Sequence, residues 1–353
     1  MTLSTASRGT GWASRLPTVS PTAFRRLCQV TVVMVTLIVL SGAAVRLTGS
    51  GLGCSDWPDC THGHLTPPLQ FHSLVEFGNR LVTVLLTVVV AATVLASLRR
   101  LPFRRDLVWL SLGLVGGVVL QAVMGGIVVY TKLNPYVVMV HFLASMPLVV
   151  VAVVLLYRAT RDYSEGSGRL AVPRPVRLMS WLLAGMLTLV LAAGSATTGA
   201  SPDAGSSQGQ ERAKRIPVSL HTLAELHATM ALFLVGFAVA LALALHAMDV
   251  PERVRRAGRV LVMVFFAQAG VGYAQYFTHL PALLVELHVT GATILVIGVT
   301  YFVLSMTYHP PERLSVPGRP AGTGKSGKGQ PAGEGRSAEP ATPASAPEGA
   351  AVG

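Results

Sequence analysis

The sequence predicts an all-α integral membrane protein whose eight transmembrane helices form two tandem four-helix bundles with the same orientation. Three observations support this fold class. Hydrophobic residues make up 51% of the 353 residues and charged residues only 12%, with a mean hydropathy of +0.56, which excludes an ordinary soluble domain. Eight apolar runs are long enough to cross a bilayer, which takes about 20 helical residues. A block of polar residues occurs once in each half.

The eight apolar runs are all expected to be helices, because an isolated strand would leave its backbone groups unpaired in lipid. The first run has full spanning length and follows a polar, basic segment, so no cleavable signal peptide is expected. The runs cover 27–45, 74–98, 107–130, 136–157, 178–198, 220–245, 260–277 and 282–304.

Cations collect in alternate connections between these runs. Arginines precede the first run and lie between runs two and three, four and five, and six and seven. By the positive-inside rule, both termini are expected in the cytoplasm of a multi-pass cell-membrane protein. The net charge of +12 follows mostly from this pattern, so nucleic acid is not expected as a partner, and membrane lipid is. The other connections hold few cations, namely Arg46, Lys132, Arg212, Lys214 and Arg215.

The chain divides into five expected parts. Residues 1–26 form a cytoplasmic N-terminal tail, 27–157 the first four-helix half, 158–177 a basic cytoplasmic linker, 178–304 the second four-helix half, and 305–353 a cytoplasmic tail. The last part is rich in Pro, Gly, Ala and Ser, cannot bury enough apolar surface to fold, and is expected to be disordered. Residues 200–210 are expected to be a flexible external loop.

The block that occurs twice consists of Gln-x-x-x-Gly, then Pro, then His. Twenty residues separate the Gln from the His in both copies, and each His lies inside an apolar run. Two equivalent histidines predict a duplicated bundle that holds a group that imidazole can ligate, with haem iron as the first candidate. The residues are Gln121, Gly125, Pro135 and His141 in the first half and Gln268, Gly272, Pro281 and His288 in the second.

Histidines lie at one depth in three of the runs. His141, His227 and His288 are six to eight residues from the expected outer ends, roughly 10 Å deep at 1.5 Å per residue, and Asn79 reaches a similar depth. A b-type haem between two helices takes one imidazole from each, and His227 with His288 supply such a pair. A lone intramembrane His is more often a satisfied polar residue, but three at one depth favour ligation of haem iron.

The remaining histidines carry weaker signals. His221 lies on another helical face from His227 and is either an accessory or a solvated residue. The others are expected at loops or helix ends, where solvated roles are favoured: His62, His64, His246, His279 and His309.

The second run contains Glu76-Phe-Gly-Asn79-Arg80. Glu76 and Arg80 are four residues apart with the acid first, which favours a helical ion pair. Either the two charges only neutralise each other, or Glu76 does proton or charge chemistry near a bound substrate while Arg80 meets an anion such as a haem propionate. Glu225 and Glu286 flank the second-half histidines and are either structural or tune a cofactor.

The connection after the first run has the sequence Gly49-Ser-Gly-Leu-Gly-Cys54-Ser-Asp-Trp-Pro-Asp-Cys60. Both cysteines are expected outside the cell, where thiols oxidise, so a disulfide is expected. The spacing is not that of a zinc pair. The disulfide is either structural or exchanges with a thiol partner, whereas Cys28, at the cytoplasmic end, is expected to be inert.

Taken together, these motifs resemble the haem A synthases over roughly residues 25–305. The resemblance implies a membrane oxidoreductase that oxidises a methyl group of haem O to a formyl group, giving haem A for terminal oxidase assembly. It implies haem b as cofactor in the second half and haem O as substrate in the first. It also implies haem O synthase and a thiol–disulfide or quinol electron donor as partners.

By position, the resemblance implies that His227 and His288 ligate haem b, that His141 ligates the substrate haem, and that Glu76 is the catalytic carboxylate. Many members have a His three residues after this glutamate, where this chain has Asn79. Either the substrate haem is five-coordinate through His141, or His72 replaces the missing ligand. The first is favoured, because two helical turns put His72 roughly 10 Å away along the axis.

Two other classes of function remain open from the sequence. An electron-carrying membrane b-type cytochrome explains the histidines but gives Glu76 and Arg80 no role. A transporter built from a parallel repeat would use the histidines as a proton relay.

Overall fold

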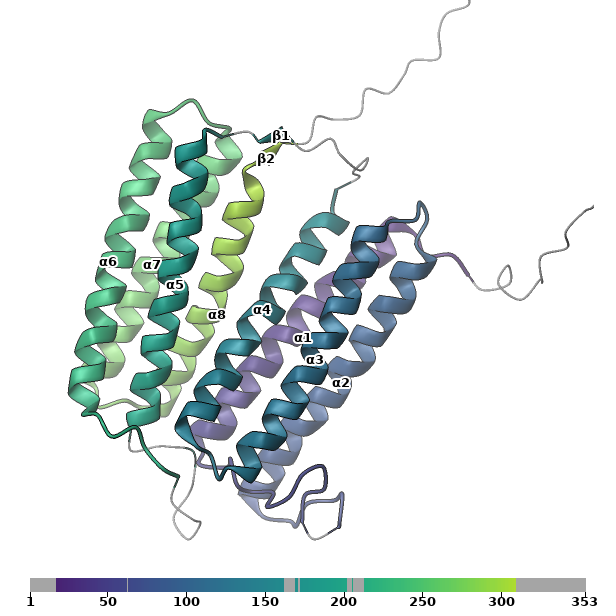
Figure 1. Ribbon diagram of the computed structural model, residues 1–353, viewed down its shortest axis with the longest axis vertical. Helices are drawn as coiled ribbons and strands as arrows, with labels where there is room; N and C mark the ends of the chain where they lie inside the picture. The colour runs from purple at the N-terminus through teal and green to yellow at the C-terminus, as the bar shows by residue number, and fades with distance from the viewer. Residues whose placement is uncertain are drawn as a thin grey trace, which may run out of the picture. The chain divides into compact units, whose positions relative to one another are not determined.

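The structure is a computed structural model that describes residues 17–61, 63–161, 169–170, 172–201, 205 and 213–308. Residues 1–16, most of the predicted loop 200–210, the tail from 309 onwards, His62 and His309 lie outside the described residues. Of two compact units, 1–310 and 311–353, only the first contains described residues. Its elements are α1 (Pro21–Leu47), α2 (Phe71–Arg99), α3 (Arg105–Tyr130), α4 (Pro135–Ala159), β1 (Arg169–Leu170), α5 (Arg174–Ala200), α6 (Leu220–Ala247), α7 (Glu252–Phe277), α8 (Ala282–Ser305) and β2 (Thr307–Tyr308) (Figure 1).

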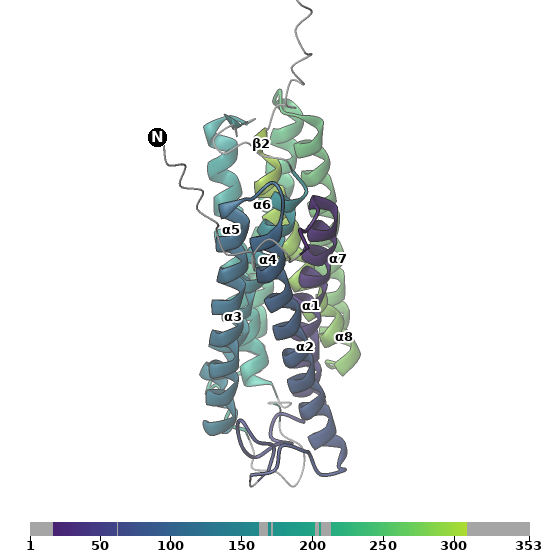
Figure 2. The ribbon, with the colours of Figure 1, turned by 90° about the vertical axis from the view of Figure 1, so that its right-hand side faces the viewer.

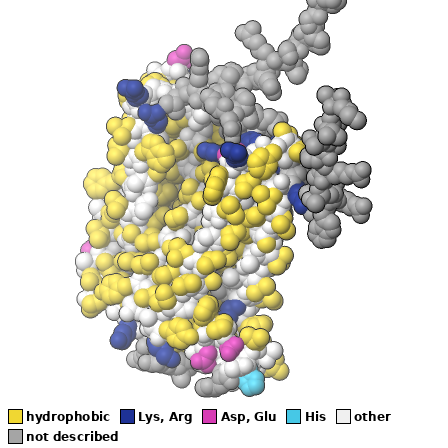
Figure 3. Space-filling model, turned by 45° about the vertical axis from the view of Figure 1, so that its right-hand side comes forward, with side chains coloured by type: hydrophobic (Ala, Val, Ile, Leu, Met, Phe, Trp, Pro, Cys, Tyr) yellow, Lys and Arg dark blue, Asp and Glu magenta, His cyan; other side chains and the backbone are white. Residues whose placement is uncertain are grey.

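The eight helices found among the described residues are all long and apolar enough to cross a membrane. On the face that Figure 3 shows, hydrophobic side chains cover the flank and charged side chains lie toward its two ends. The predicted fold class, an all-α multi-pass membrane protein, is therefore confirmed. One short addition is an antiparallel pairing of β1 with β2, which joins the connection before α5 to the residues after α8.

Each half of the chain forms its own ring of four helices. Helix α1 packs against α2 and α4, and α3 packs against the same two helices. The second half repeats this pattern, with α5 and α7 both packed against α6 and α8. The second and fourth helices of each half therefore face each other across the middle of their ring. Helices α1 and α5 start at the same end (Figure 1), as the predicted tandem arrangement requires.

The two halves are joined by packing and by polar contacts. Helix α4 packs against α5 and α8, and α1 packs against α8. At one end, the Tyr157 hydroxyl donates to the Leu304 carbonyl over 2.7 Å. At the other end, Arg46 Nη2 donates to the Thr198 carbonyl over 2.7 Å. These contacts tie α4 to α8 and α1 to α5, and so fix the walls of the space between the halves.

Most helices begin before the predicted apolar runs, and in α1 and α4 a polar capping side chain marks where the helix begins. Helix α1 begins at Pro21, so residues 21–26 of the predicted tail are helical. The Ser20 hydroxyl accepts from the Ala23 amide over 3.2 Å, and proline is favoured at the first helical position. Helix α4 begins in the same way, with Asn134 as its cap.

The connection between α1 and α2 projects beyond the helix ends at one end of the bundle (Figures 1 and 2). It contains a disulfide between Cys54 and Cys60, which confirms the predicted bond. Cys28 is the free cysteine and is buried on α1.

Candidate functional site

A cavity of about 1190 Å³ lies between the two halves and is lined by residues of all eight helices. Pockets for small molecules usually measure roughly 300–1,000 Å³, so this cavity has room for a large ligand or for two. Its walls are mostly apolar. The polar side chains that were singled out from the sequence and that line it include Glu76, Asn79, His141, His227 and His288.

In the second half, His227 on α6 and His288 on α8 face each other. Their ring centres are 6.1 Å apart and their planes are 79° to each other. Imidazole nitrogens bind metal ions at about 2 Å, so two rings on opposite sides of one ion have nitrogens about 4 Å apart and ring centres roughly 6 Å apart. The observed spacing fits two axial ligands of one iron.

Hydrogen bonding selects which ring nitrogen of these histidines can coordinate. His227 Nδ1 is 3.1 Å from the Val190 carbonyl of α5, the contact that an Nδ1–H makes when it donates to backbone oxygen. Such a bond orients the ring and leaves Nε2 for the metal. His288 Nδ1 is buried without a hydrogen-bond partner, and the Cε1–Nδ1 edge of the ring lies against Gly272 of α7. His288 also lines the cavity, which leaves Nε2 as the nitrogen that can meet a ligand there.

Two glycines leave the space that these rings occupy. A Cβ on Gly194 of α5 would lie 2.8 Å from Cε1 of His227, and a Cβ on Gly272 of α7 would lie 3.1 Å from Cε1 of His288. Both distances are shorter than ordinary van der Waals contacts. Gly272 belongs to the repeated block, whereas Gly194 was missed in the sequence, where its only signal is a glycine inside an apolar run.

The glutamine of each repeated block holds the backbone of its histidine. Gln268 Nε2 donates to the His288 carbonyl over 2.8 Å, and Gln121 Nε2 donates to the His141 carbonyl over 3.4 Å. The spacing of twenty residues therefore has a physical reason. The glutamine bridges two antiparallel helices, and the glycine one turn later lies beside the imidazole.

The first half has a single imidazole at the corresponding level. His141 Nδ1 is buried without a hydrogen-bond partner, and the Asn79 carboxamide on α2 accepts from the Ser41 hydroxyl over 2.8 Å. His72 is in the first turn of α2, where its Nδ1 pairs with the Ser50 hydroxyl over 3.0 Å, and it does not line the cavity. The structure therefore does not bring His72 to the place of the missing ligand.

Glu76 and Arg80 form the predicted ion pair, with 2.8 Å between Oε1 and Nη2. The pair also holds the disulfide loop. Glu76 Oε2 accepts from the Cys54 amide over 2.7 Å, and the Arg80 guanidinium donates to the carbonyls of Asp56 and Asp59 over 2.9 and 2.8 Å. Glu76 is only 5% exposed and lies on the cavity wall. The contact between Arg80 and a propionate stays a prediction, since both terminal nitrogens already have partners here.

The disulfide loop closes the first half of the cavity at this end. Trp57 and Pro58 line the cavity. The Trp57 ring lies against Gly126 of α3, where a Cβ would be 2.9 Å from the indole, and the Tyr130 hydroxyl donates to the Trp57 carbonyl over 2.8 Å. The loop thus packs across α2 and α3.

The other candidates lie away from the centre of the cavity. His221 and Glu225 face each other across 3.4 Å and are both exposed, although Glu225 lies at the cavity edge. Glu286 has a buried oxygen, Oε2, without a hydrogen-bond partner. Three histidines predicted to be solvated are exposed: His64, His246 and His279.

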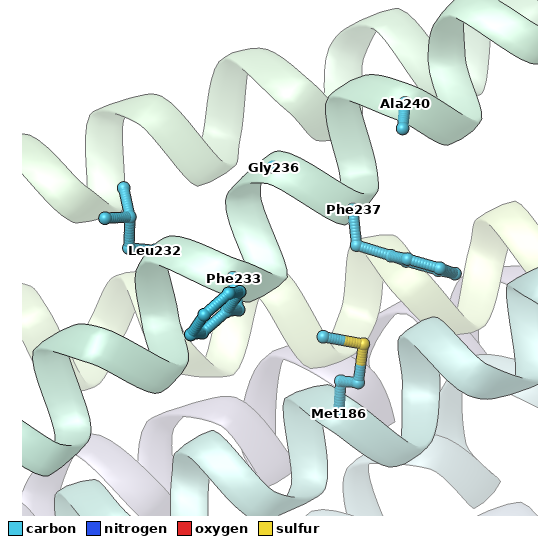
Figure 4. A pocket seen from close by; sticks show the side chains of 6 residues that line it. All are labelled: Met186, Leu232, Phe233, Gly236, Phe237 and Ala240. Carbon is cyan, nitrogen blue, oxygen red and sulfur yellow. The ribbon is translucent and has the colours of Figure 1, made fainter.

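A second, shallow depression of about 420 Å³ lies on α5 and α6. Its lining is entirely apolar and carries no group for acid–base or ligand chemistry. The residues are Met186, Leu232, Phe233, Gly236, Phe237 and Ala240 (Figure 4).

These observations define the class, a multi-pass membrane protein with two imidazoles at the spacing of axial haem ligands. The described residues contain no group of three or more His, Cys, Asp or Glu side chains that could hold a metal ion. Two imidazoles are enough for haem, because the porphyrin supplies the other four nitrogens.

The chain belongs to the COX15-CtaA family, described as cytochrome oxidase assembly protein, which matches residues 25–74 and 68–300. Similar curated proteins are named "Heme A synthase". The one from Staphylococcus saprophyticus is 30% identical over 167 residues, 46% of this chain and 55% of that protein. One from Staphylococcus aureus is 31% identical over 160 residues, 44% and 52% respectively. The chain thus spans about half the length of the curated relatives it matches.

Proposed function

We propose that this protein is a haem A synthase, an oxidoreductase that converts haem O to haem A for terminal oxidase assembly. Two successive two-electron oxidations would turn one porphyrin methyl group into a hydroxymethyl and then a formyl group, with the added oxygen atom taken from O2 or from water. With O2, the dioxygen itself is the oxidant and an external donor supplies the two electrons that reduce its second oxygen atom to water. With water, an external electron acceptor is the oxidant. The observation that carries the proposal is the shared cavity. It presents an imidazole pair in one half and, in the other, a single imidazole with a buried carboxylate on the same wall.

His227 and His288 would hold a b-type haem, and their spacing and free Nε2 atoms support this assignment. Such a haem, when bound, supplies one-electron transfer to or from the substrate half. Val190 orients the His227 ring, and Gln268 fixes the backbone of His288. The Gly194 backbone leaves room for the His227 ring.

Haem O would bind between α2 and α4 with its iron on His141. Glu76 is one turn from Asn79 toward the disulfide end and lies on the same cavity wall. Both of its oxygens accept hydrogen bonds from N–H donors, Cys54 and Arg80. This arrangement supports Glu76 as a fixed negative charge that stabilises positive charge developing at the ring edge.

The proposed location is the cell membrane with both termini in the cytoplasm. The connections from α2 to α3 and from α6 to α7 carry the arginines, and the disulfide loop is at the opposite end. An external disulfide could exchange with a thiol–disulfide electron donor. A quinol, which dissolves in the membrane and could reach the apolar flank, is the other proposed donor. Haem O synthase is the proposed source of the substrate.

Chromatography of haems extracted from a host that makes haem O but no haem A tests the proposal. Haem A, or its hydroxylated intermediate, is expected when this chain is produced. With an electron donor present, unchanged haem O and co-purifying haem B would instead favour an electron-carrying cytochrome. Absence of any haem would favour a transporter.

A Glu76→Gln variant tests the carboxylate within that assay. It should fold and keep the low-spin haem signal, but form no haem A, because the shape is kept and the charge is lost. Glu252→Gln, an exposed carboxylate at the other end of the bundle, is the matched control and should form haem A normally. Normal haem A yield in Glu76→Gln would rule out the proposed role.

A further inference from the structure

The two halves of the cavity differ in the side chain that faces the fourth helix of the ring. In the second half α6 provides His227, and in the first half α2 provides Asn79. Each side chain is anchored to the preceding helix, His227 through the Val190 carbonyl and Asn79 through the Ser41 hydroxyl. Asn79 thus has the place of a second axial ligand but a different chemical group.

The orientation of the Asn79 carboxamide is set by Ser41. The Ser41 hydroxyl has one proton and two acceptors within reach, Asn79 Oδ1 at 2.8 Å and the Ile38 carbonyl at 3.2 Å. Donation to the nearer of the two, Oδ1, uses the acceptor side of the amide. Nδ2 makes no hydrogen bond with the described residues and is not among their buried atoms that lack a partner. Because Asn79 lines the cavity, its N–H groups face that space.

An amide in this position cannot replace an imidazole as a ligand. Haem iron in proteins is held by His, Cys, Met or Tyr side chains. The Oδ1 and Nδ2 atoms of a carboxamide reach only as far from the backbone as Nδ1 and Cδ2 of an imidazole. The space that Cε1 and Nε2 of a histidine would fill therefore stays open. That space suits a molecule of two or three atoms, and hydrogen-bond donors beside an open iron position help to decide whether such a molecule binds.

We propose that Asn79 leaves the sixth coordination position of the substrate haem iron open and donates a hydrogen bond from its amide to a small ligand bound there, of the class of molecular oxygen. Ser41 is a positioning residue, because it fixes the amide with its N–H groups toward the iron. The inference rests on the proposed function, which places the substrate haem on His141.

Cyanide titration of the purified ferric protein with its haems bound tests the inference without turnover. The wild-type protein should contain one high-spin haem that binds cyanide and is lost in His141→Ala, beside a low-spin haem that does not bind it. Asn79→Leu, which keeps the size but removes the donor, should stay high-spin and bind cyanide about tenfold more weakly, the effect of one hydrogen bond. Asn79→His should give a low-spin haem with strongly reduced cyanide binding.

The matched control is Ser145→Ala. Ser145 also lines the cavity, but its hydroxyl donates to the Phe142 carbonyl over 2.6 Å and offers no proton to a ligand. This variant should leave the spectrum and the cyanide affinity unchanged.

The outcomes separate the inference from the proposed function. A cyanide-binding haem that survives His141→Ala would overturn the haem site behind the proposed function and this inference with it. A His141-dependent haem whose cyanide affinity is the same in Asn79→Leu would overturn the inference alone, as would a wild-type protein with only low-spin haem. Neither of these last two results would contradict the proposed function, which the host assay of haem A formation tests separately.

Discussion

Replacing Gly194 by alanine tests the second-half site most directly. The added methyl carbon would lie 2.8 Å from Cε1 and 3.2 Å from Nδ1 of His227. The ring cannot retreat without giving up its Nδ1 contact with Val190. Overpacking of this kind costs about 1–3 kcal/mol, which corresponds to haem binding weaker by roughly 5-fold to 150-fold. The variant should therefore lose haem from the second half.

Gly185→Ala on the same helix is the control, since a Cβ there meets no atom within 4 Å. Alanine is favoured over glycine in a helix by about 1 kcal/mol, so this variant should keep its haem and unfold at a slightly higher temperature. The assay is haem per protein after purification, with the low-spin spectrum as a second readout. Full haem content with an unchanged spectrum in Gly194→Ala would refute the assignment of His227 and the packing argument behind it.

Two further changes test the repeated block and the loop. Gln268→Leu removes the 2.8 Å hydrogen bond to the His288 carbonyl and should lower the stability of the second half by about 1 kcal/mol. The purified variant should therefore lose haem faster than the wild-type protein. Gln121→Leu should have a smaller effect on stability, since its bond is 3.4 Å, and equal effects of the two variants would contradict this reasoning. Joint replacement of Cys54 and Cys60 by serine should lower stability to thermal unfolding by about 2 kcal/mol, the entropy of opening a short loop. An unchanged unfolding temperature would show that the contacts of Glu76 and Arg80 are enough to hold the loop.

The sequence was sufficient to predict the features that repeat or that follow from local chemistry. The spanning helices follow from hydropathy, and the cavity-lining positions of the three histidines follow from their places in these helices. The repeated block predicted equivalent Gln–His contacts in the two halves, and the ion pair of Glu76 and Arg80 follows from their spacing in one helix.

The features that the sequence did not reveal depend on contacts between distant segments. No local pattern indicates that Gly194 makes room for His227 or that Glu76 accepts from the Cys54 amide. The role of Trp57 against α3 likewise appears only once the loop is folded back. The starts of α1 and α4 were misplaced for a different reason, because hydropathy follows the lipid whereas their caps, Ser20 and Asn134, are polar.

The two facing imidazoles come from two different helical hairpins, and this affects how the second half is held together. His227 belongs to the hairpin α5–α6 and His288 to the hairpin α7–α8, so a haem ligated by both, as proposed, would cross-link two hairpins of the same half. Its binding energy adds to the stability of the assembled half. A haem held by His141 alone is ligated by only one hairpin, α3–α4. If the proposed ligands are right, loss of haem from the second half would loosen the packing of its two hairpins, whereas the first half could release its haem without that cost.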